Sequence, residues 1–221
     1  MKKEWSEEEL EEIASQLCNP VGEAGIKTGE FMNLSNANMI SRGFELPAIN
    51  KKDRILEIGP GNGFHVSELV NLTDGIEYCG VDISETMISE AEKINQIWVE
   101  KGVVSFTKSD GNILPFSDNY FDKILTVNTI YFWQNPAAYG TEILRVLKPG
   151  GVFSLVFSDK NFMQQLPFTK YKFSLYNKDL AHELLRNSGF EVLETVEELE
   201  TIQNNSGENI KRPIIIILAK K

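Results

Sequence analysis

R-I-L-E-I-G-P-G-N-G, residues 54–63, is the stretch that decides the fold of this chain. Ile55, Leu56 and Ile58 form a short apolar run, mostly β-branched, which predicts a buried strand. Three glycines follow at once, and residues 64–72 have the apolar spacing of a helix. Glycine permits a sharp turn and a close approach of the backbone to a ligand. Since the turn also presents free backbone N–H groups at a helix N-terminus, it predicts either a binding loop or a ligand-free tight turn.

Strand and helix signals alternate through the rest of the chain. Strands are predicted over 77–81, 103–108, 121–128, 152–157, 190–196 and 213–219, and helices over 84–101, 137–147 and 177–188. Repeated strand–helix units predict a doubly wound, mostly parallel sheet with helices on both faces. The link between the last two strands is too short for a crossover helix, so these strands should form an antiparallel hairpin. We therefore predict an α/β fold with a seven-stranded sheet whose last strand is antiparallel.

Composition excludes several classes of protein. The 221 residues suit one large domain, and no apolar run approaches the ~20 residues of a membrane span. The N-terminus lacks the apolar core of a signal peptide. Cys18 and Cys79 fit neither a metal site nor a disulfide framework, so we predict no metal and reduced thiols in the cytoplasm. A net charge of −10 with scattered Lys and Arg argues against nucleic acid as a partner.

The first 50 residues are predicted to form a helical cap within the same domain as residues 51–221. Ser6–Leu17 has an N-cap residue and an acidic first turn, and Glu30–Leu46 is predicted as a second helix. The glycine-rich segment Val21–Gly29 between them is predicted as a loop. The second helix is unusually rich in asparagine, at Asn33, Asn36 and Asn38. Asparagine is a poor helix former, so this segment is either an irregular helix or a lid over a ligand.

Polar residues follow four of the predicted parallel strands. Because ligands bind beyond the carboxyl ends of the strands in open α/β sheets, these residues should face one crevice. Asp82 ends the second strand, roughly 20 residues after the glycine turn, where a carboxylate can accept both hydroxyls of a ribose. Asp110 ends the third strand and suits the amine of an adenine. The candidate cofactor-binding residues are Glu57, Gly59, Gly61, Asn62, Asp82, Ile83, Met87, Asp110, Gly111, Asn112, Asn128 and Thr129.

Each of these groups also has a structural alternative. Asp82 precedes Ser84 and can serve as a helix-entry cap. Asp110-Gly111 is a common turn pair, and Asn128 can be a satisfied polar residue at a strand end. Because all of these groups occur in order and at these spacings, we favour a shared ligand site.

Four separate segments resemble the class I S-adenosylmethionine-dependent methyltransferases, in the group that acts on small molecules. They are ILEIGPGNG (55–63), CGVDISETMI (79–88), KSDGNILPFSDNYFDKI (108–124) and EILRVLKPGG (142–151). The resemblance implies a Rossmann-like methyltransferase fold, S-adenosylmethionine as the cofactor and a small-molecule methyl acceptor. It is close over residues 51–151 and extends to the remainder through strand order.

The resemblance also implies a role for each part of the crevice. The turn at 59–63 would face the methionine portion of the cofactor, and Asp82 would hold its ribose. Asp110 and Gly111 would hold the adenine, with Ile83 and Met87 as apolar surface against it. Asn128 and Thr129 would line the floor near the sulfonium.

Methyl transfer from a sulfonium needs little acid–base chemistry, because alignment and exclusion of water can supply most of the rate. A base is needed only where the acceptor is protonated. The candidates are His65 and Tyr131, followed by Glu30 and His182, and each of the four can equally be a structural residue. Tyr131 and the aromatic segment Phe162–Tyr176 lie where an acceptor pocket is expected. The sequence specifies neither the acceptor atom nor the oligomeric state.

Two other functions compete with this interpretation. An NAD(P)-dependent oxidoreductase usually carries G-x-G-x-x-G, whereas here the third glycine comes early. Pro60 also removes one N–H donor that a pyrophosphate would use. A non-catalytic protein that binds an adenosyl ligand would keep the same cofactor groups, so the sequence separates it from an enzyme less well.

Overall fold

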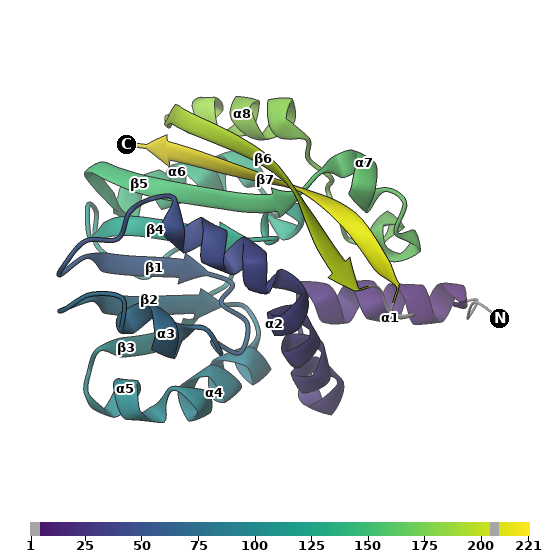
Figure 1. Ribbon diagram of the computed structural model, residues 1–221, viewed down its shortest axis with the longest axis horizontal. Helices are drawn as coiled ribbons and strands as arrows, with labels where there is room; N and C mark the ends of the chain where they lie inside the picture. The colour runs from purple at the N-terminus through teal and green to yellow at the C-terminus, as the bar shows by residue number, and fades with distance from the viewer. Residues whose placement is uncertain (1–4, 204–207) are drawn as a thin grey trace.

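A seven-stranded sheet in the order β3-β2-β1-β4-β5-β7-β6 forms the centre of the computed structural model, which describes residues 5–203 and 208–221 (Figure 1). Strands β1 to β5 are parallel to one another, and β7 is antiparallel to both of its neighbours. The predicted sheet, with its antiparallel last strand, is therefore confirmed. The strands are β1 (Arg54–Ile58), β2 (Glu77–Asp82), β3 (Val104–Lys108), β4 (Phe121–Val127), β5 (Leu147–Ser158), β6 (Glu191–Gln203) and β7 (Asn209–Lys220).

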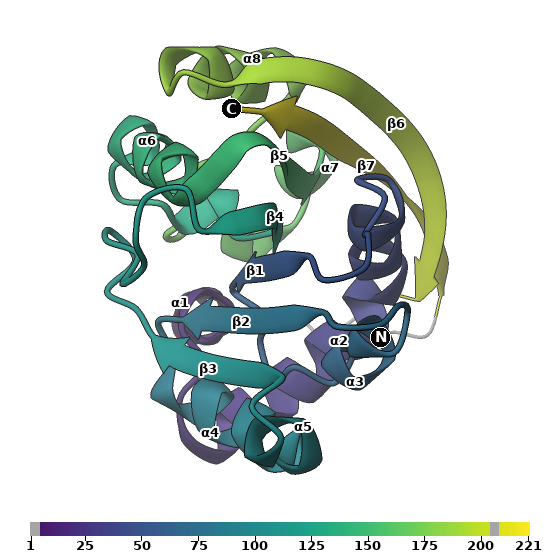
Figure 2. The same ribbon diagram turned by 90° about the vertical axis from the view of Figure 1, so that its left-hand side faces the viewer.

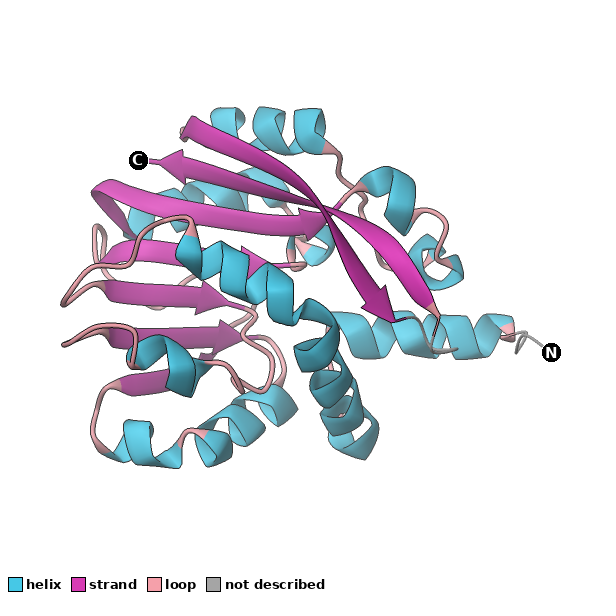
Figure 3. Ribbon diagram, viewed as in Figure 1, coloured by secondary structure: helices cyan, strands magenta, loops and turns pink. Residues whose placement is uncertain are grey.

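Helices cover both faces of this sheet (Figures 2 and 3). Residues of α2, α3 and α4 pack with one face in a common apolar cluster, and residues of α6, α7 and α8 pack with the other. Helix α1 lies beyond the carboxyl ends of the strands (Figure 1). The helices are α1 (Glu7–Cys18), α2 (Gly22–Glu45), α3 (Val66–Val70), α4 (Glu85–Ile94), α5 (Gln96–Glu100), η1 (Ile130–Phe132), α6 (Pro136–Val146), α7 (Lys160–Met163), η2 (Pro167–Lys170) and α8 (Lys178–Asn187).

The strand sequences explain why the sheet is buried on both sides. Along β1, Ile55 belongs to the cluster with α2 and α3, whereas Leu56 and Ile58 belong to the cluster with α6 and α8. In β7 the run Ile214–Ile217 alternates between the two clusters in the same way. Successive side chains of a strand point to opposite faces, so a continuous apolar run specifies a strand with helices on both sides.

The prediction of a loop over Val21–Gly29, made from its glycines, is wrong. Helix α2 begins at Gly22 and runs without a break to Glu45. Close packing explains the glycines. A Cβ on Gly25 would lie 2.6 Å from the carbonyl carbon of Pro20, and a Cβ on Gly29 would lie 2.8 Å from Met87 Sδ. Glycine is unfavourable within a helix, but here it permits contacts that a larger residue would prevent.

Other boundaries differ more modestly from the predictions. The single helix predicted over 84–101 is two helices, since Asn95 interrupts it and donates its Nδ2 to the Gly63 carbonyl oxygen at 2.9 Å. The helix expected over 64–72 is only five residues long. The β6–β7 hairpin extends several residues beyond both predicted strands. At Asn95 the difference reflects a tertiary contact rather than local propensity.

The outer half of the β6–β7 hairpin binds α2 as well as the sheet. Arg212 pairs with Glu200 across the hairpin, with both side chains 8% exposed, and its Nη1 donates to Asn36 Oδ1 at 3.3 Å. Arg42 pairs with Glu198 at 2.7 Å. The hairpin thereby fixes the side of α2 that lies over the carboxyl edge of the sheet.

Two sequence expectations concern the chain ends and membranes. The prediction that the chain lacks a signal peptide rests partly on residues 1–4, which lie outside the described residues. Over 5–203 and 208–221, no helix has both the length and the apolar character needed to cross a bilayer.

Candidate active site

A cavity lies at the edge where the carboxyl ends of β1, β2, β3 and β4 meet. In the glycine turn after β1, Gly59, Gly61 and Gly63 have φ angles of +72°, +57° and +62°, which favour glycine. A Cβ on Gly59 would lie 2.5 Å from Thr129 Cγ2, whereas a Cβ on Gly61 would meet no heavy atom within 4 Å. Gly59 thus allows the ends of β1 and β4 to approach, and Gly61 leaves open space above the turn.

Glu57 supports the turn from below and is 1% exposed. Its Oε2 accepts a hydrogen bond from the Tyr78 hydroxyl at 2.7 Å and lies 2.7 Å from His65 Nε2. Burial and the Glu57 carboxylate raise the pKa of Tyr78, so this hydroxyl stays a donor. Glu57 therefore ties β2 and the start of α3 to the base of the glycine turn.

Asp82 ends β2 on the adjacent wall of the cavity. Its Oδ1 accepts from the Ser84 amide at 2.9 Å, and further backbone N–H groups come from Gly61 and Ile83. Burial raises the pKa of Asp82 to about 6, and these amides oppose the rise only in part. A ligand that donates hydrogen bonds to this carboxylate would stabilise its ionised form.

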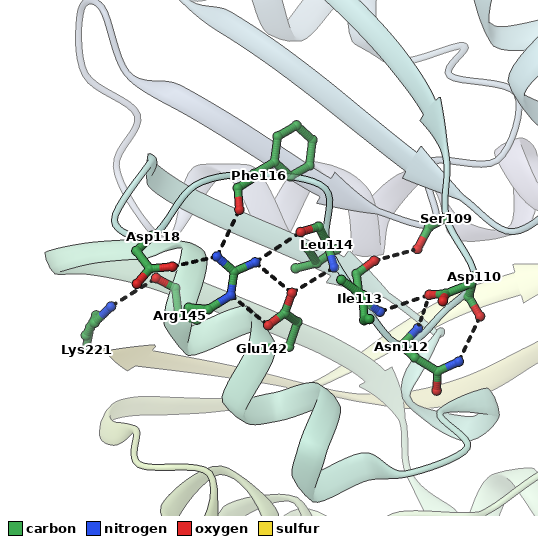
Figure 4. A network of polar contacts seen from close by, with 10 residues as sticks. All are labelled: Ser109, Asp110, Asn112, Ile113, Leu114, Phe116, Asp118, Glu142, Arg145 and Lys221. Carbon is green, nitrogen blue, oxygen red and sulfur yellow. Dashed lines mark hydrogen bonds and ion pairs between the residues drawn. The ribbon is translucent and has the colours of Figure 1, made fainter.

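Asp110 lies at the rim, in the loop that follows β3 (Figure 4). Its Oδ1 accepts from the backbone amides of Asn112 and Ile113 at 2.8 and 2.9 Å, and these bonds lower its pKa. Gly111 brings this loop close to the one after β2, since a Cβ on it would lie 3.3 Å from Ile83 Cγ2. Asp110-Gly111 can therefore form a turn and also contribute to a ligand site, because the turn places the Asp110 carboxylate at the cavity.

Arg145 of α6 anchors this loop from behind (Figure 4). Its guanidinium donates to the carbonyl oxygens of Leu114 and Phe116 at 3.0 and 2.9 Å, and pairs with Asp118 and Glu142. Glu142 in turn accepts from the Leu114 amide at 2.8 Å. The segment EILRVLKPGG therefore positions the loop that carries Asp110.

The floor of the cavity follows β4. Asn128 has a φ of +57° and is held on both sides of its amide. Its Nδ2 donates to Asn36 Oδ1 at 3.2 Å, while its Oδ1 accepts from the Ser158 amide at 3.3 Å and from the Tyr131 hydroxyl at 3.1 Å. Thr129 accepts from Trp133 Nε1 at 3.1 Å. These contacts fix the floor independently of a ligand.

The turn between α1 and α2 covers the cavity. The Ser84 hydroxyl donates to the Pro20 carbonyl oxygen, and the Gly22 amide donates to Thr86 Oγ1 at 3.1 Å, so the turn is bound to the start of α4. Two of the three asparagines singled out in α2 line this cavity, Asn33 and Asn36. The structure therefore places α2 beside the ligand space, as the lid alternative requires.

A second, larger cavity of about 640 Å³ adjoins the first. Its walls are mostly apolar side chains from α1, α2, η1 and the segment between β5 and α8. Five residues line both cavities and define what we call the junction: Leu17, Met32, Asn36, Asn128 and Phe132. The volume lies within the range of small-molecule sites, which are about 300–1,000 Å³.

Comparison with known proteins finds relatives among the methyltransferases. Residues 56–155 match a family model described as a methyltransferase domain. This part of the chain is a methyltransferase domain. It is 27% identical over 157 residues to the sterol 24-C-methyltransferase of Saccharomyces cerevisiae, covering 66% of this chain and 41% of that protein. It is 28% identical over 145 residues to the fatty-acid O-methyltransferase of Mycolicibacterium smegmatis, covering 66% of this chain and 50% of that protein.

The methyltransferase fold is also seen in solved structures. The methyltransferase in a complex with the Haloferax volcanii Trm112 methyltransferase activator superposes with a TM-score of 0.73 at 17% identity, covering 96% of this chain and 97% of that one. At this identity the likeness shows the fold alone. The chain spans about half the length of the two sequence relatives, so their activities extend to it only as proposals.

S-adenosylmethionine is the cofactor of this methyltransferase family, and the first cavity fits it. Gly61 leaves room for a ligand to rest on the turn, and the buried carboxylate of Asp82 lines the same wall. Ten of the twelve predicted cofactor-binding residues line this cavity. The other two face elsewhere, because Asn62 is buried and accepts from the Phe64 amide, and Asn112 bonds to Asp110.

The two leading candidate bases, His65 and Tyr131, both have structural partners. His65 lines neither cavity, and its Nδ1 is buried without a hydrogen-bond partner in the described part of the chain. The Tyr131 hydroxyl accepts from the Ser158 amide at 2.7 Å and lies 3.0 Å from the Ser158 carbonyl oxygen. Burial raises the pKa of Tyr131, which keeps its hydroxyl neutral. Neither geometry supplies a proton acceptor to the junction.

Several residues around the cavities carry no sequence motif. The first cavity is also lined by Cys18 of α1, Gly29 of α2 and Pro20 of the turn between these helices. The aromatic segment after β5 gave a usable signal, since Phe162, Phe168 and Phe173 all line the second cavity. The asparagines of α2 were a further signal. The prediction of an N-terminal helical cap already included α1, but no individual residue of α1 was predicted to line a cavity.

Proposed function

We propose that this chain transfers a methyl group from S-adenosylmethionine to a small-molecule acceptor, with the cofactor in the first cavity and the acceptor in the second. One observation carries the proposal: the open glycine turn, the buried Asp82 and the rim Asp110 all line a cavity that joins a larger apolar one. Bound S-adenosylmethionine would supply an electrophilic methyl group on its sulfonium sulfur. Everything else asked of the protein is binding, orientation and exclusion of water.

The residues of the first cavity divide this binding among them. We propose that Asp82 accepts hydrogen bonds from the ribose hydroxyls and that Asp110 receives the adenine amine. Ile83 and Met87 would provide the apolar surface beside the adenine, and Gly59 and Gly61 would carry the methionine portion. Asn128 and Thr129 would form the floor near the reacting methyl group. Asn62 and Asn112 would act by shaping the two loops rather than by contact.

The competing functions predict different ligands. A dinucleotide would need its pyrophosphate on the glycine turn, where Pro60 has no N–H to donate. A non-catalytic adenosyl-binding protein would need no second cavity. The adjoining apolar cavity of about 640 Å³ therefore favours an enzyme with a second substrate.

The sequence relatives extend the proposal to the chemical character of the acceptor. The sterol 24-C-methyltransferase and the fatty-acid O-methyltransferase are named for substrates that are largely apolar. An apolar acceptor agrees with the walls of the second cavity. A net charge of −10 argues against nucleic acid as the acceptor.

We further propose that residues 1–50 act as a cap within one domain and that the protein is cytoplasmic. The cap would exclude water from the reacting atoms, because α1 and α2 line both cavities. Cys18 and Cys79 are free thiols, which agrees with a reducing compartment.

Calorimetric titration tests this function directly. The purified chain should bind S-adenosylhomocysteine and S-adenosylmethionine, and NAD should give no comparable heat. Release of S-adenosylhomocysteine on addition of an acceptor would then separate an enzyme from a binding protein. Tight NAD binding in the absence of adenosyl binding would reject the proposal.

A further inference from the structure

The junction between the two cavities contains no side chain that can take a proton. Its five residues are two asparagines and three apolar residues. The three carboxylates that line the first cavity, Glu57, Asp82 and Asp110, do not line the second cavity or the junction. Glu12 lines the second cavity but not the junction, and its Oε1 accepts from Gln16. An acceptor that must lose a proton, such as an alcohol or a phenol, would find no base there.

Asn36 offers a hydrogen-bond donor at the junction. Its Oδ1 accepts from Asn128 Nδ2 at 3.2 Å and from Arg212 Nη1 at 3.3 Å, and these two donors fix the orientation of the amide. Within the described residues, Nδ2 of Asn36 has no hydrogen-bond partner, and the side chain is half-buried. Asn36 lines both cavities, so this amide nitrogen is an available donor at the junction.

The second cavity itself suits an apolar group. Phe31, which is 49% exposed, lines it together with the aromatic residues that follow β5. The two basic side chains of the wall are each paired, Arg212 with Glu200 and Lys27 with Glu23. A ligand with an aliphatic body and one polar end would bury its body here and place its polar end at Asn36.

From this geometry we infer that the acceptor is a largely apolar carboxylic acid, methylated on a carboxylate oxygen. The inference rests on the proposed function of the first cavity. A carboxylic acid is ionised at neutral pH, so its oxygen is a nucleophile without a base. Asn36 Nδ2 donates to the oxygen that does not react and so orients the other one.

The transfer balances without a further reactant. One carboxylate oxygen forms a bond to the methyl carbon, and the carbon–sulfur bond breaks with its electron pair left on sulfur. The carboxylate loses its negative charge as the sulfonium loses its positive charge. The products are a methyl ester and S-adenosylhomocysteine, and no proton is transferred.

The test is a methyl-transfer panel with S-adenosylmethionine, read out by mass spectrometry of the methylated product. The panel contains straight-chain carboxylic acids of four to sixteen carbons and the primary alcohol that matches each acid. We expect methyl esters of the long acids, a fall of at least tenfold in kcat/KM for the shortest acids, and no ether from any alcohol. Methylation of the alcohols, or equal rates for short and long acids, would overturn the inference.

Asn36→Asp is the sharpest variant, because an aspartate can still accept from Asn128 and Arg212 but donates nothing and repels a carboxylate. We expect at least a tenfold fall in kcat/KM for the long acids. Leu34→Asp is the matched control, since Leu34 is 83% exposed on the same helix and lines neither cavity. The control should match the parent. Equal losses in both variants would overturn the role of Asn36.

Titration with S-adenosylhomocysteine on the same samples separates the two proposals. If the parent binds it but no acid is methylated, the carboxylic acid inference fails while the adenosyl site stands. If the parent does not bind it, the proposed function fails and the inference fails with it. If the Asp variant binds it like the parent, the loss of rate is assigned to the acceptor.

Discussion

The two cavities of this protein are built in different ways. The walls of the first come mostly from strand ends and the loops after them, with α1, α2 and the turn between them covering the remaining side, and main-chain hydrogen bonds fix its two aspartates. The walls of the second come from side chains on helices α1 and α2, the segment after β5 and the β6–β7 hairpin, which are far apart in the sequence. Local sequence can therefore specify the cofactor side, whereas the acceptor side depends on tertiary packing.

The largest loss of cofactor affinity is expected when a side chain fills the space over the glycine turn. Gly61→Ala places a methyl group where no heavy atom lies within 4 Å, in the space proposed for the cofactor. We expect the affinity for S-adenosylhomocysteine to fall on the order of 100-fold, or about 3 kcal/mol. Calorimetric titration measures this loss.

Gly150→Ala is the matched control for backbone strain. Gly150 has a φ of +78°, also has no heavy atom within 4 Å of a Cβ and lies outside both cavities. Both variants should lose about 1 kcal/mol of stability from the left-handed conformation. Only Gly61→Ala should lose affinity, and parallel losses would mean that the turn acts through stability alone.

The next largest effect is expected at Asp82. Replacement by Asn keeps a polar side chain but removes the charge that ribose hydroxyls would favour, so we expect affinity at pH 8 to fall about tenfold to 100-fold. In the parent, the pKa of about 6 means that affinity should decrease as the pH falls below 6, because protonation competes with binding. The affinity of the Asp82→Asn variant should not change with pH over this range. A parent profile that is equally flat would contradict the role of Asp82.

Stability should change in the opposite direction at the same residue. The pKa of Asp82 is raised by burial from 3.8 to about 6, so its contribution to stability is full below pH 3.8 and is lost as the pH rises through 6. The loss is up to about 3 kcal/mol. In urea titrations without ligand, Asp82→Asn should therefore exceed the parent in stability at pH 8, and the difference should narrow toward pH 4.

A moderate effect is expected where α6 supports the rim. Arg145→Ala removes the donors that hold the carbonyl oxygens of Leu114 and Phe116, which loosens the loop carrying Asp110. We expect a fall in cofactor affinity of about fivefold to tenfold, roughly 1 kcal/mol. Arg186→Ala, on the exposed side of α8, should leave the affinity unchanged. The idea would fail if both variants behaved alike.

The smallest effect is expected at His65. Because His65 lines neither cavity, its replacement by Ala should change cofactor affinity by no more than about twofold, a free-energy difference below 0.5 kcal/mol. Methyl-transfer rates should follow the same pattern. A tenfold loss of rate with unchanged cofactor affinity would instead support His65 as a base.

Most of the fold could be predicted from the sequence because its signals are local. The alternating strand and helix signals and the glycine turn predicted a mostly parallel, seven-stranded sheet. The short link before Pro213–Ala219 predicted that its last strand is antiparallel. The start of α2 was missed because Gly25 and Gly29 act through contacts with Pro20 and Met87, residues that a local pattern does not connect to them. Tertiary packing overrides helix propensity at such positions.

The same distinction applies to the candidate site. Ten of the twelve predicted cofactor residues line one cavity, because they lie at or shortly after the carboxyl ends of strands whose positions are set by the sheet. Asn36 was noticed as an asparagine in a helix, but its orientation depends on Asn128 and Arg212, which are 92 and 176 residues away in the chain. Contacts over such separations are specified only by the folded structure.

Helix α2 contributes Met32 and Asn36 to both cavities, and the hairpin residue Arg212 holds Asn36 in place. A shift of this one helix would change the affinity of both sites together. By thermodynamic reciprocity, whichever compound enters first should alter the dissociation constant of the other by the same factor. Coupled binding of the two substrates, rather than independent binding, is the behaviour that such a shared wall favours.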